Sequence, residues 1–152
     1  MRTLTVTDIG SIQTMTDASD RFVIKAPVDK TFDALTVALR DVGIEPTAVN
    51  GAAHTVGNPG FIKTGKLGHT PMTSFFECGS DMTGPRASKD RMTIALNATV
   101  LSAAGGISEV RTQLTASSRN MMGASSDAVP CGSTGRLENA IKVATELRLV
   151  RP

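Results

Sequence analysis

Alternating apolar and polar residues mark two neighbouring strands in the second half of the chain. From Arg91 to Leu101 an apolar side chain stands at every second position, and the pattern returns from Ile107 to Ala116. The two runs are separated by Ala-Ala-Gly-Gly at 103–106, which suits a hairpin loop. The pattern predicts an antiparallel hairpin with one buried face.

Helical spacing of apolar residues occurs in two segments. Residues 28–42 follow Pro27, which suits the first turn of a helix, and precede Gly43, which suits a left-handed cap with Ile44 folded back onto the last turn. Residues 133–148 form the second helix, which Ser133 or Thr134 can cap. The apolar stripe predicted for this second helix consists of Leu137, Ala140, Ile141, Ala144 and Leu147.

The remaining segments are shorter. Residues 21–25 form a β-branched strand, and Met72 to Cys78 alternates as a strand with one mostly buried face. Glycine and proline divide residues 47–80 into short strands with tight turns. We expect surface loops at 80–90 and 120–130.

The order of these elements predicts an α+β fold. Residues 1–19 form a short strand and a polar spacer, and residues 20–150 form a single domain, since 152 residues are few for two. A helix stripe and a sheet face are buried only by packing together, so we expect both helices on one face of an antiparallel sheet.

Composition excludes several classes of function. Sixteen Lys and Arg against fourteen Asp and Glu give a net charge of +2, and the aromatic residues are five Phe without Trp or Tyr. This balance argues against nucleic acid as a partner. We expect no membrane span, because the apolar runs are short, and no export signal, because residues 1–20 lack a hydrophobic core.

No motif assigns a catalytic, cofactor or metal residue. Residues 60–67 have the glycine and lysine spacing of a phosphate loop, but Leu67 replaces the required Ser or Thr and Pro71 prevents a following helix. The only histidines, His54 and His69, lack metal-ligand neighbours, although either could serve a small hydrolase or cyclase with a distant partner.

The two cysteines, Cys78 and Cys131, are fifty-three positions apart. Three interpretations stay open: one disulfide, two unrelated thiols, or a reactive Cys131 at the start of the last helix, where CGSTGR is one residue short of a phosphatase loop.

The segment RFVIKAPVDKTFDALTVAL at 21–39 resembles the start of helix-grip proteins of the START lipid-transfer and polyketide-cyclase superfamily. Those proteins usually have two short helices after the first strand and a longer last helix than this chain offers. VGN at 56–58, LGHTPMTSFFECG at 67–79 and VPCGSTGRLENAI at 129–141 resemble uncharacterised bacterial envelope domains, some of them lipoproteins, which are similar to helix-grip modules of an outer-membrane assembly lipoprotein.

This resemblance implies a helix-grip-like fold, an extracytoplasmic location in the periplasm or envelope, and the Cys78–Cys131 bridge; it brings no catalytic residue. We therefore expect a non-enzymatic module that binds an envelope protein or a small apolar ligand, with no cofactor. The alternatives are the hydrolase or cyclase using His54 or His69, and a purely structural interaction domain with an exposed apolar patch.

Overall fold

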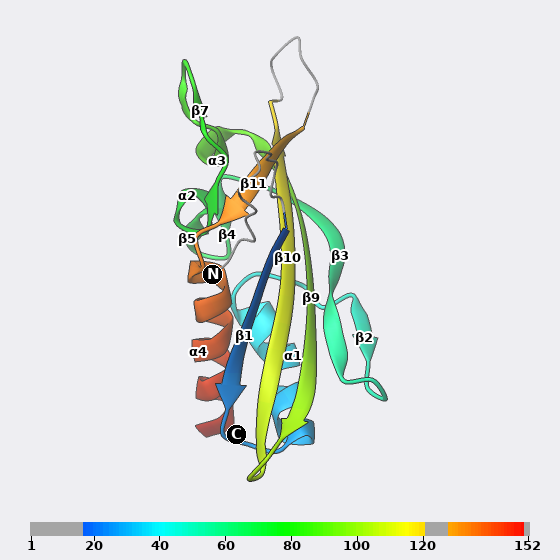
Figure 1. Ribbon diagram of the computed structural model, residues 1–152. Coiled ribbons are helices and arrows are strands. Elements are labelled where there is room, and N and C mark those ends of the chain that lie inside the picture. The colour runs from blue at the N-terminus through cyan, green and yellow to red at the C-terminus, as the bar shows by residue number, and fades with distance from the viewer. Residues whose placement is uncertain (1–16, 121–127, 151–152) are drawn as a thin grey trace, which may run out of the picture.

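The computed structural model describes residues 17–120 and 128–150 and contains a seven-stranded antiparallel sheet (Figure 1). The strand order is β2-β3-β9-β10-β11-β6, and β1 also pairs with β10. The strands of this sheet are β1 (Asp17–Ile24), β2 (Ala48–Asn50), β3 (Thr55–Thr64), β6 (Phe76–Glu77), β9 (Arg91–Ala103), β10 (Ile107–Arg119) and β11 (Val129–Ser133). The other elements are β4 (Lys66–Leu67), β5 (Thr70–Pro71), β7 (Ser80–Asp81), β8 (Gly84–Pro85), α1 (Val28–Asp41), α2 (Met72–Phe75), α3 (Arg86–Lys89) and α4 (Arg136–Val150).

The predicted hairpin is confirmed and forms the centre of the sheet. Strands β9 and β10 pair without interruption from Ala103 opposite Ile107 to Arg91 opposite Arg119. From Met92 to Val100 and from Ser108 to Ser118 every second side chain is buried, as the alternation predicted. The buried apolar positions are Met92, Ile94, Leu96, Ala98, Val100, Val110, Leu114 and Ala116.

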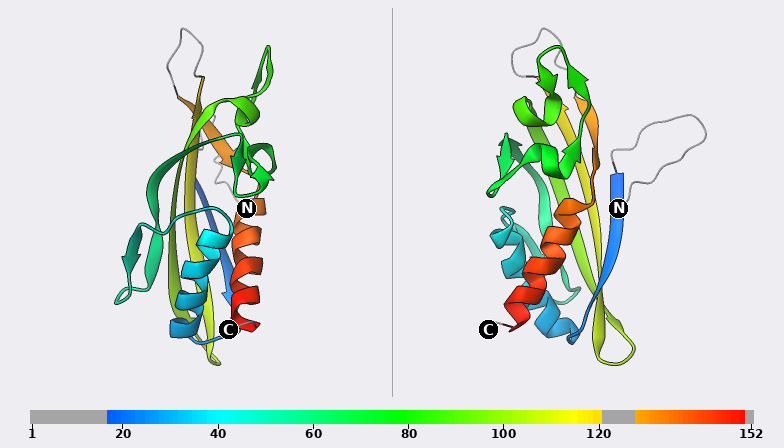
Figure 2. Two further views of the ribbon diagram at one scale, coloured as in Figure 1. Left: turned by 180° about the vertical axis from the view of Figure 1, so that it is seen from behind. Right: turned by 90° about the vertical axis from the view of Figure 1, so that its left-hand side faces the viewer.

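Helices α1 and α4 pack against each other and lie on the same face of the sheet, as Figure 2 shows from the side. The fold is therefore α+β, with the N-terminal and C-terminal helices on one face, in the arrangement that the sequence predicted. The buried apolar cluster lies between these layers and includes Leu35 and Leu39 of α1 and Leu137 and Ile141 of α4.

The end of α1 has the predicted cap. Gly43 has a φ of 100°, its N–H donates to the carbonyl of Arg40, and the N–H of Ile44 donates to the carbonyl of Leu39. These two bonds form a Schellman motif, and Ile44 is fully buried beside it. A side chain on Gly43 would also meet the backbone N of Gly68 at 2.6 Å, so glycine is required for close packing as well.

Helix α4 begins at Arg136, later than predicted, and the predicted stripe is buried at Leu137 and Ile141, half-buried at Ala140 and Ala144, and exposed at Leu147. The Thr134 hydroxyl accepts a hydrogen bond from the Arg136 N–H at 3.3 Å. Leu137, Ile141 and Thr145 are buried, whereas Leu147, predicted to lie in the stripe, is 53% exposed. The stripe follows i, i+4 and i+8, and Thr145 is accommodated because its hydroxyl donates to the Ile141 carbonyl at 2.7 Å.

The interpretation of Met72 to Cys78 as one strand is wrong. Pro71 precedes a single helical turn, α2, and strand geometry begins only at Phe76. Met72 and Phe75 are both buried, a spacing of three that fits a turn of helix and not a strand.

The polar segment 80–90 is more ordered than the predicted loop. It contains the β7–β8 hairpin and α3, and Lys89 Nζ lies 2.6 Å from Asp81 Oδ2 and 3.2 Å from Asp90 Oδ1. The hydrogen bond from Lys89 holds the pKa of Asp81 well below its ordinary value.

Two further boundaries differ from the sequence analysis. Strand β1 begins at Asp17, within the predicted spacer, because β10 provides a pairing partner as far as Thr115. Strand β11 occupies residues 129–133, which overlap the end of one predicted loop and the start of the predicted helix. The short strand predicted at the start of residues 1–19 and most of the predicted loop at 120–130 lie outside the described residues.

Candidate functional site

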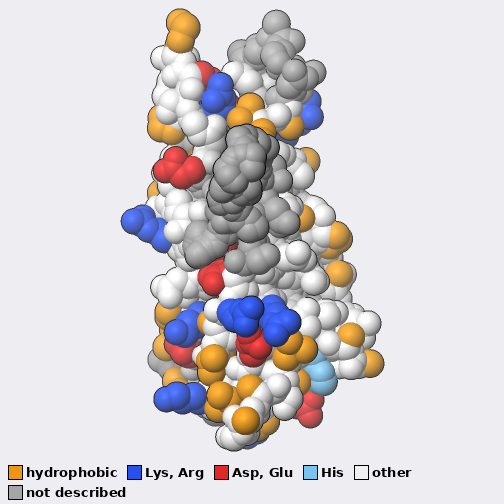
Figure 3. All heavy atoms as spheres, in the orientation of Figure 1, with side chains coloured by type: hydrophobic (Ala, Val, Ile, Leu, Met, Phe, Trp, Pro, Cys, Tyr) orange, Lys and Arg blue, Asp and Glu red, His pale blue; other side chains and the backbone are white. Residues whose placement is uncertain are grey.

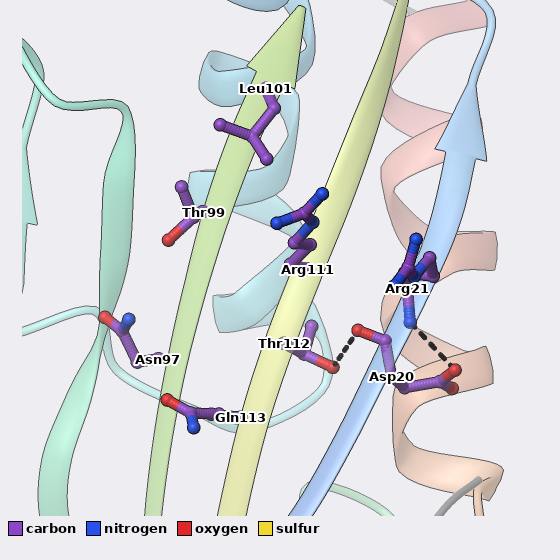
Figure 4. Close-up of a pocket in the computed structure, with 8 residues that line it drawn as sticks. All are labelled: Asp20, Arg21, Asn97, Thr99, Leu101, Arg111, Thr112 and Gln113. Atoms are coloured by element: carbon purple, nitrogen blue, oxygen red, sulfur yellow. Dashed lines mark hydrogen bonds between the residues drawn. The ribbon is translucent and has the colours of Figure 1, made fainter. Parts of the chain in front are cut away.

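The face of the sheet opposite the two helices carries an open groove of about 550 Å³. We call this the outer-face groove. Figure 4 shows its side chains, which come from three adjacent strands, β1, β10 and β9. The lining residues are Asp20, Arg21, Asn97, Thr99, Leu101, Arg111, Thr112 and Gln113.

The strand register arranges these side chains in rows across the sheet. In the central row Arg21 of β1 stands opposite Arg111 of β10, which stands opposite Thr99 of β9. On one side Gln113 is opposite Asn97. The groove thus combines guanidinium, hydroxyl and amide groups on neighbouring positions.

The row on the other side of the arginines is largely apolar. Glu109 stands between Val23 of β1 and Leu101 of β9. In the same orientation as Figure 1, Figure 3 shows Lys and Arg side chains beside a group of hydrophobic side chains on the lower part of this face. The chemistry of the surface therefore changes from polar to apolar along the strands.

Glu109 is the acidic partner of both groove arginines. Its Oε2 lies 3.2 Å from Arg21 Nη1 and its Oε1 lies 3.3 Å from Arg111 Nη2. One carboxylate is therefore shared by two guanidinium groups. This arrangement offsets part of the repulsion between like charges that face each other across two strands.

Backbone contacts fix the edge of the groove. The Thr112 hydroxyl donates to the Asp20 carbonyl at 3.5 Å, and the Arg21 N–H donates to Asp20 Oδ1 at 2.8 Å. The Asp20 carboxylate points away from β9 in Figure 4. Asp20 thus shapes the edge between β1 and β10 while the arginines occupy the open surface.

A second open hollow, also about 550 Å³, contains His54. His54 Nε2 lies 3.0 Å from Asp29 Oδ1, and its ring packs edge-on against Phe32. The His54 side chain is 29% exposed and the Asp29 side chain 88% exposed, so this pair lies at the surface. His54 also has a φ of 54°, a left-handed conformation that is costly for a non-glycine residue.

The structure does not bring the two histidines into one site, because His69 is exposed between β4 and β5. Within the described residues, no group of three or more His, Cys, Asp or Glu side chains is arranged to hold a metal ion.

The two phosphate-loop-like segments have structural explanations. Residues 60–67 cover the end of β3 and strand β4 and lead into β5, so no helix begins directly after them to orient amide groups toward a phosphate. The expectation that Pro71 prevents a following helix is wrong, because the single turn α2 begins at Met72. Cys131 of CGSTGR is bonded to Cys78, and the described residues contain no free cysteine. Neither segment provides a phosphate site or a reactive thiol.

The disulfide joins β11 to the segment after β6, next to the start of α4. The two Cα atoms are 4.3 Å apart, and the neighbouring residues Gly132 and Glu77 pair across the strands. A Cβ on Gly132 would meet nothing within 4 Å, so its role is not steric.

A buried carboxylate beside this bridge escaped the sequence analysis. Glu138 in the first turn of α4 is 1% exposed, and the Ser133 hydroxyl contacts both its oxygens, at 2.9 and 3.0 Å. The Thr134 hydroxyl donates to the Ser74 carbonyl at 2.6 Å. The sequence Ser-Thr-Gly-Arg-Leu-Glu at 133–138 indicates the start of a helix, but it does not indicate that Glu138 is buried.

The outer-face groove lies outside the space between the sheet and the helices, and the His54 hollow opens at the edge of that space, between the start of α1 and the turn that joins β9 to β10. That space is filled by the apolar cluster, in which Leu35, Leu39, Val110, Leu137 and Ile141 are fully buried. Because the inner face is covered, the outer-face groove is an open surface formed by strands of the main sheet. Among the described helices, none is long and apolar enough to cross a membrane.

Comparison with known proteins identifies no family. No family model matches the chain, and no curated protein matches it. A crystal structure of Ara h 8.0201 is similar over 90% of this chain and 98% of that chain, with 11% identity and a TM-score of 0.46. A DUF4468 family protein from Bacteroides ovatus ATCC 8483 is similar over 87% and 77%, with 11% identity and a TM-score of 0.36. At these scores the similarities assign neither a family nor a function.

Proposed function

We propose that this protein is a non-enzymatic, extracytoplasmic binding module that contacts a partner protein through the outer-face groove. The observation that supports this proposal is the division between the two faces of the sheet. The inner face is covered by α1 and α4, whereas the outer face presents guanidinium, amide and hydroxyl groups in an open hollow. An open surface that combines charged, polar and apolar groups fits a protein partner better than an enclosed apolar ligand.

The location outside the cytoplasm is supported by the cysteines. A stable disulfide that closes a fifty-three-residue separation is typical of proteins in oxidising compartments. The bacterial envelope domains that resemble this sequence agree with such a compartment. The location is tested by trapping free thiols in intact cells of the native organism, where full reactivity of Cys78 and Cys131 would contradict it.

The binding face is tested by site-specific photo-crosslinking in the native organism. A benzophenone amino acid replaces Gln113, which lines the groove, or Val143, which is 45% exposed on α4. We expect a crosslinked protein from position 113 and none from position 143. Thermal unfolding of both variants checks that each is folded.

Other outcomes of this experiment favour the alternatives. Crosslinking only from position 143 would support a structural interaction domain that docks through the exposed residues Val143, Leu147 and Val150 of α4. Absence of crosslinks, together with a retained lipid in native mass spectrometry, would support a small apolar ligand. Either result would overturn the proposed use of the outer face.

A hydrolase or cyclase is the second candidate, and the contact between His54 and Asp29 is the observation that favours it. A carboxylate can orient a histidine that acts as a general base. The same contact also ties the β2–β3 turn to the first turn of α1, which is a structural role. Turnover of generic ester substrates that is lost in His54→Asn but kept in His69→Asn would establish a hydrolase; equal, background rates would exclude an esterase that uses His54.

A further inference from the structure

The two arginines of the outer-face groove are placed where sheet stability disfavours them. Arg21 and Arg111 are direct partners across β1 and β10. Side chains at such positions have Cβ atoms about 4.5–5.5 Å apart, and like charges there destabilise the sheet. Both side chains are mostly exposed, so packing of the core does not require them.

Glu109 neutralises this pair incompletely. It makes one contact with each arginine, at 3.2 and 3.3 Å, and it carries one negative charge against two positive charges. The other carboxylate of the groove, Asp20, accepts the Arg21 backbone N–H and points away from β9. A guanidinium group has several N–H donors in a planar fork, so donors remain on both arginines for a ligand.

The positions beside the arginines indicate what else the ligand carries. Asn97 and Gln113 offer amide groups on one side, and Val23 and Leu101 offer apolar surface on the other. Val23 is 49% exposed although it is apolar. An anionic group next to an apolar group would therefore match the surface in both charge and hydrophobicity.

We propose that Arg21 and Arg111 bind a carboxylate side chain of the partner protein, while an adjacent apolar side chain of the partner rests on Val23 and Leu101. This inference rests on the proposed function and specifies the chemistry of the partner. Arginine and carboxylate form paired, charge-assisted hydrogen bonds, which favours this ligand over a neutral one. The partner surface is thus an acidic segment with a neighbouring apolar residue.

The probe is the peptide acetyl-Leu-Glu-Leu-amide, and its binding is followed by backbone amide shifts in nuclear magnetic resonance. We expect shifts in β1, β9 and β10 around the groove. The peptide with Gln in place of Glu should bind about tenfold more weakly or worse, because it loses the charge-assisted contacts. Inorganic phosphate as a competitor distinguishes a carboxylate site from a general anion site.

Variants of the whole chain complete the test. The double variant Arg21→Gln with Arg111→Gln should bind the Glu peptide about tenfold more weakly or worse. Glu109→Gln should bind it more tightly, because both arginines lose their carboxylate partner. The matched control is Arg91→Gln with Arg119→Gln, which removes the same charge from another pair of facing arginines outside the groove. Thermal unfolding should show that the groove variant is as stable as the parent or more stable.

Four results would each overturn the inference. The first two are no binding of the Glu peptide and equal affinity for the Glu and Gln peptides. The other two are displacement of the Glu peptide by phosphate at equal concentration and equal losses of affinity in the groove and control variants. Crosslinking from position 113 separates this failure from that of the proposed function. If the groove variant keeps its full crosslinking yield, the outer face binds a partner without the arginines and only the carboxylate assignment is wrong.

Discussion

At the scale of single residues, Gly57 allows the close approach of two neighbouring strands. It pairs with Asn97 on β9, and a Cβ built on Gly57 would lie 2.1 Å from the carbonyl oxygen of Leu96. The clash is with backbone, which a small rotation of a side chain cannot relieve. The register shift between Asn58 and Phe61 follows immediately, so this part of β3 is already irregular.

We therefore expect Gly57→Ala to lower the free energy of unfolding by at least about 1–3 kcal/mol, the range for overpacking. Gly51→Ala is the control, since a Cβ there would meet nothing within 4 Å. Urea unfolding of both variants measures the difference. If Gly57→Ala were as stable as Gly51→Ala, the close approach of β3 and β9 would be disproved.

At the scale of elements, α4 is held by a narrow stripe and by one ion pair with α1. Leu137 and Ile141 are fully buried, whereas Leu147 faces solvent. Arg148 Nε and Nη2 donate to the two carboxylate oxygens of Asp41, each at 2.8 Å. The helix is thus buried along Leu137, Ile141 and Thr145, and its last turn is held by this pair and by half-buried Leu149.

Two leucine truncations on α4 compare a buried position with an exposed one. Leu137→Ala should lower the free energy of unfolding by about 2–5 kcal/mol, because it leaves a cavity in the core. Leu147→Ala should change the unfolding free energy by less than about 0.5 kcal/mol. Comparable losses measured by chemical denaturation would show that the buried stripe is the one the apolar pattern predicted.

The ion pair between the helices predicts a pH dependence. The hydrogen bond from Arg148 holds the pKa of Asp41 below its ordinary value of 3.8. A carboxyl group whose pKa is lowered in the folded state contributes its full stabilisation at pH values above the ordinary pKa. It loses this contribution as the pH falls through the lowered pKa. The effect is small, because both side chains are more than a third exposed.

Asp41→Asn should therefore be slightly less stable than the parent at pH 7, and the two should converge as the pH falls below about 4. Melting temperatures measured from pH 2.5 to 7 at low salt test this. A difference that stays constant over the whole range would mean that the change acts through something other than the charge of Asp41.

At the scale of the whole molecule, the disulfide joins the segment before the central β9–β10 hairpin to strand β11, which follows it. Cys78 precedes β9 and Cys131 follows β10, so the bridge closes a loop that contains both central strands. It lies beside Glu138, Ser133 and Thr134, which fix the start of α4. Sheet and helix are therefore tied together at one position.

Replacing both cysteines, as Cys78→Ser with Cys131→Ser, should cost about 4 kcal/mol if the bridge acts mainly by restricting the unfolded chain. The measurement is denaturant unfolding of this variant against the oxidised parent, with the reduced parent as a control for the serine side chains. An unchanged midpoint would show that the bridge does not stabilise the domain.

The local pattern of the sequence determined the elements whose burial follows a simple period. The β9–β10 hairpin, α1 with its Gly43 cap, and the presence of a C-terminal helix all follow from side chains within about a dozen neighbouring positions. The α+β class follows as well, because amphipathic helices and half-buried strands must cover each other. Alternation even separated the outer-face residues Asn97, Thr99, Arg111 and Gln113 from the core.

The tertiary structure alone decided which segments meet. Arg21 faces Arg111 only because β1 pairs with β10 across ninety positions of sequence, and no local pattern encodes that partner. The burial of Thr145 in place of Leu147 and of Glu138 beside Ser133 depends on how α4 is rotated against α1 and the sheet. Alternation over only seven residues is a weak indication of a strand. The helical turn at Met72 formed instead, with Phe75 and Phe76 packed edge to face. The candidate site is therefore a product of long-range pairing, whereas the framework that carries it follows from local periodicity.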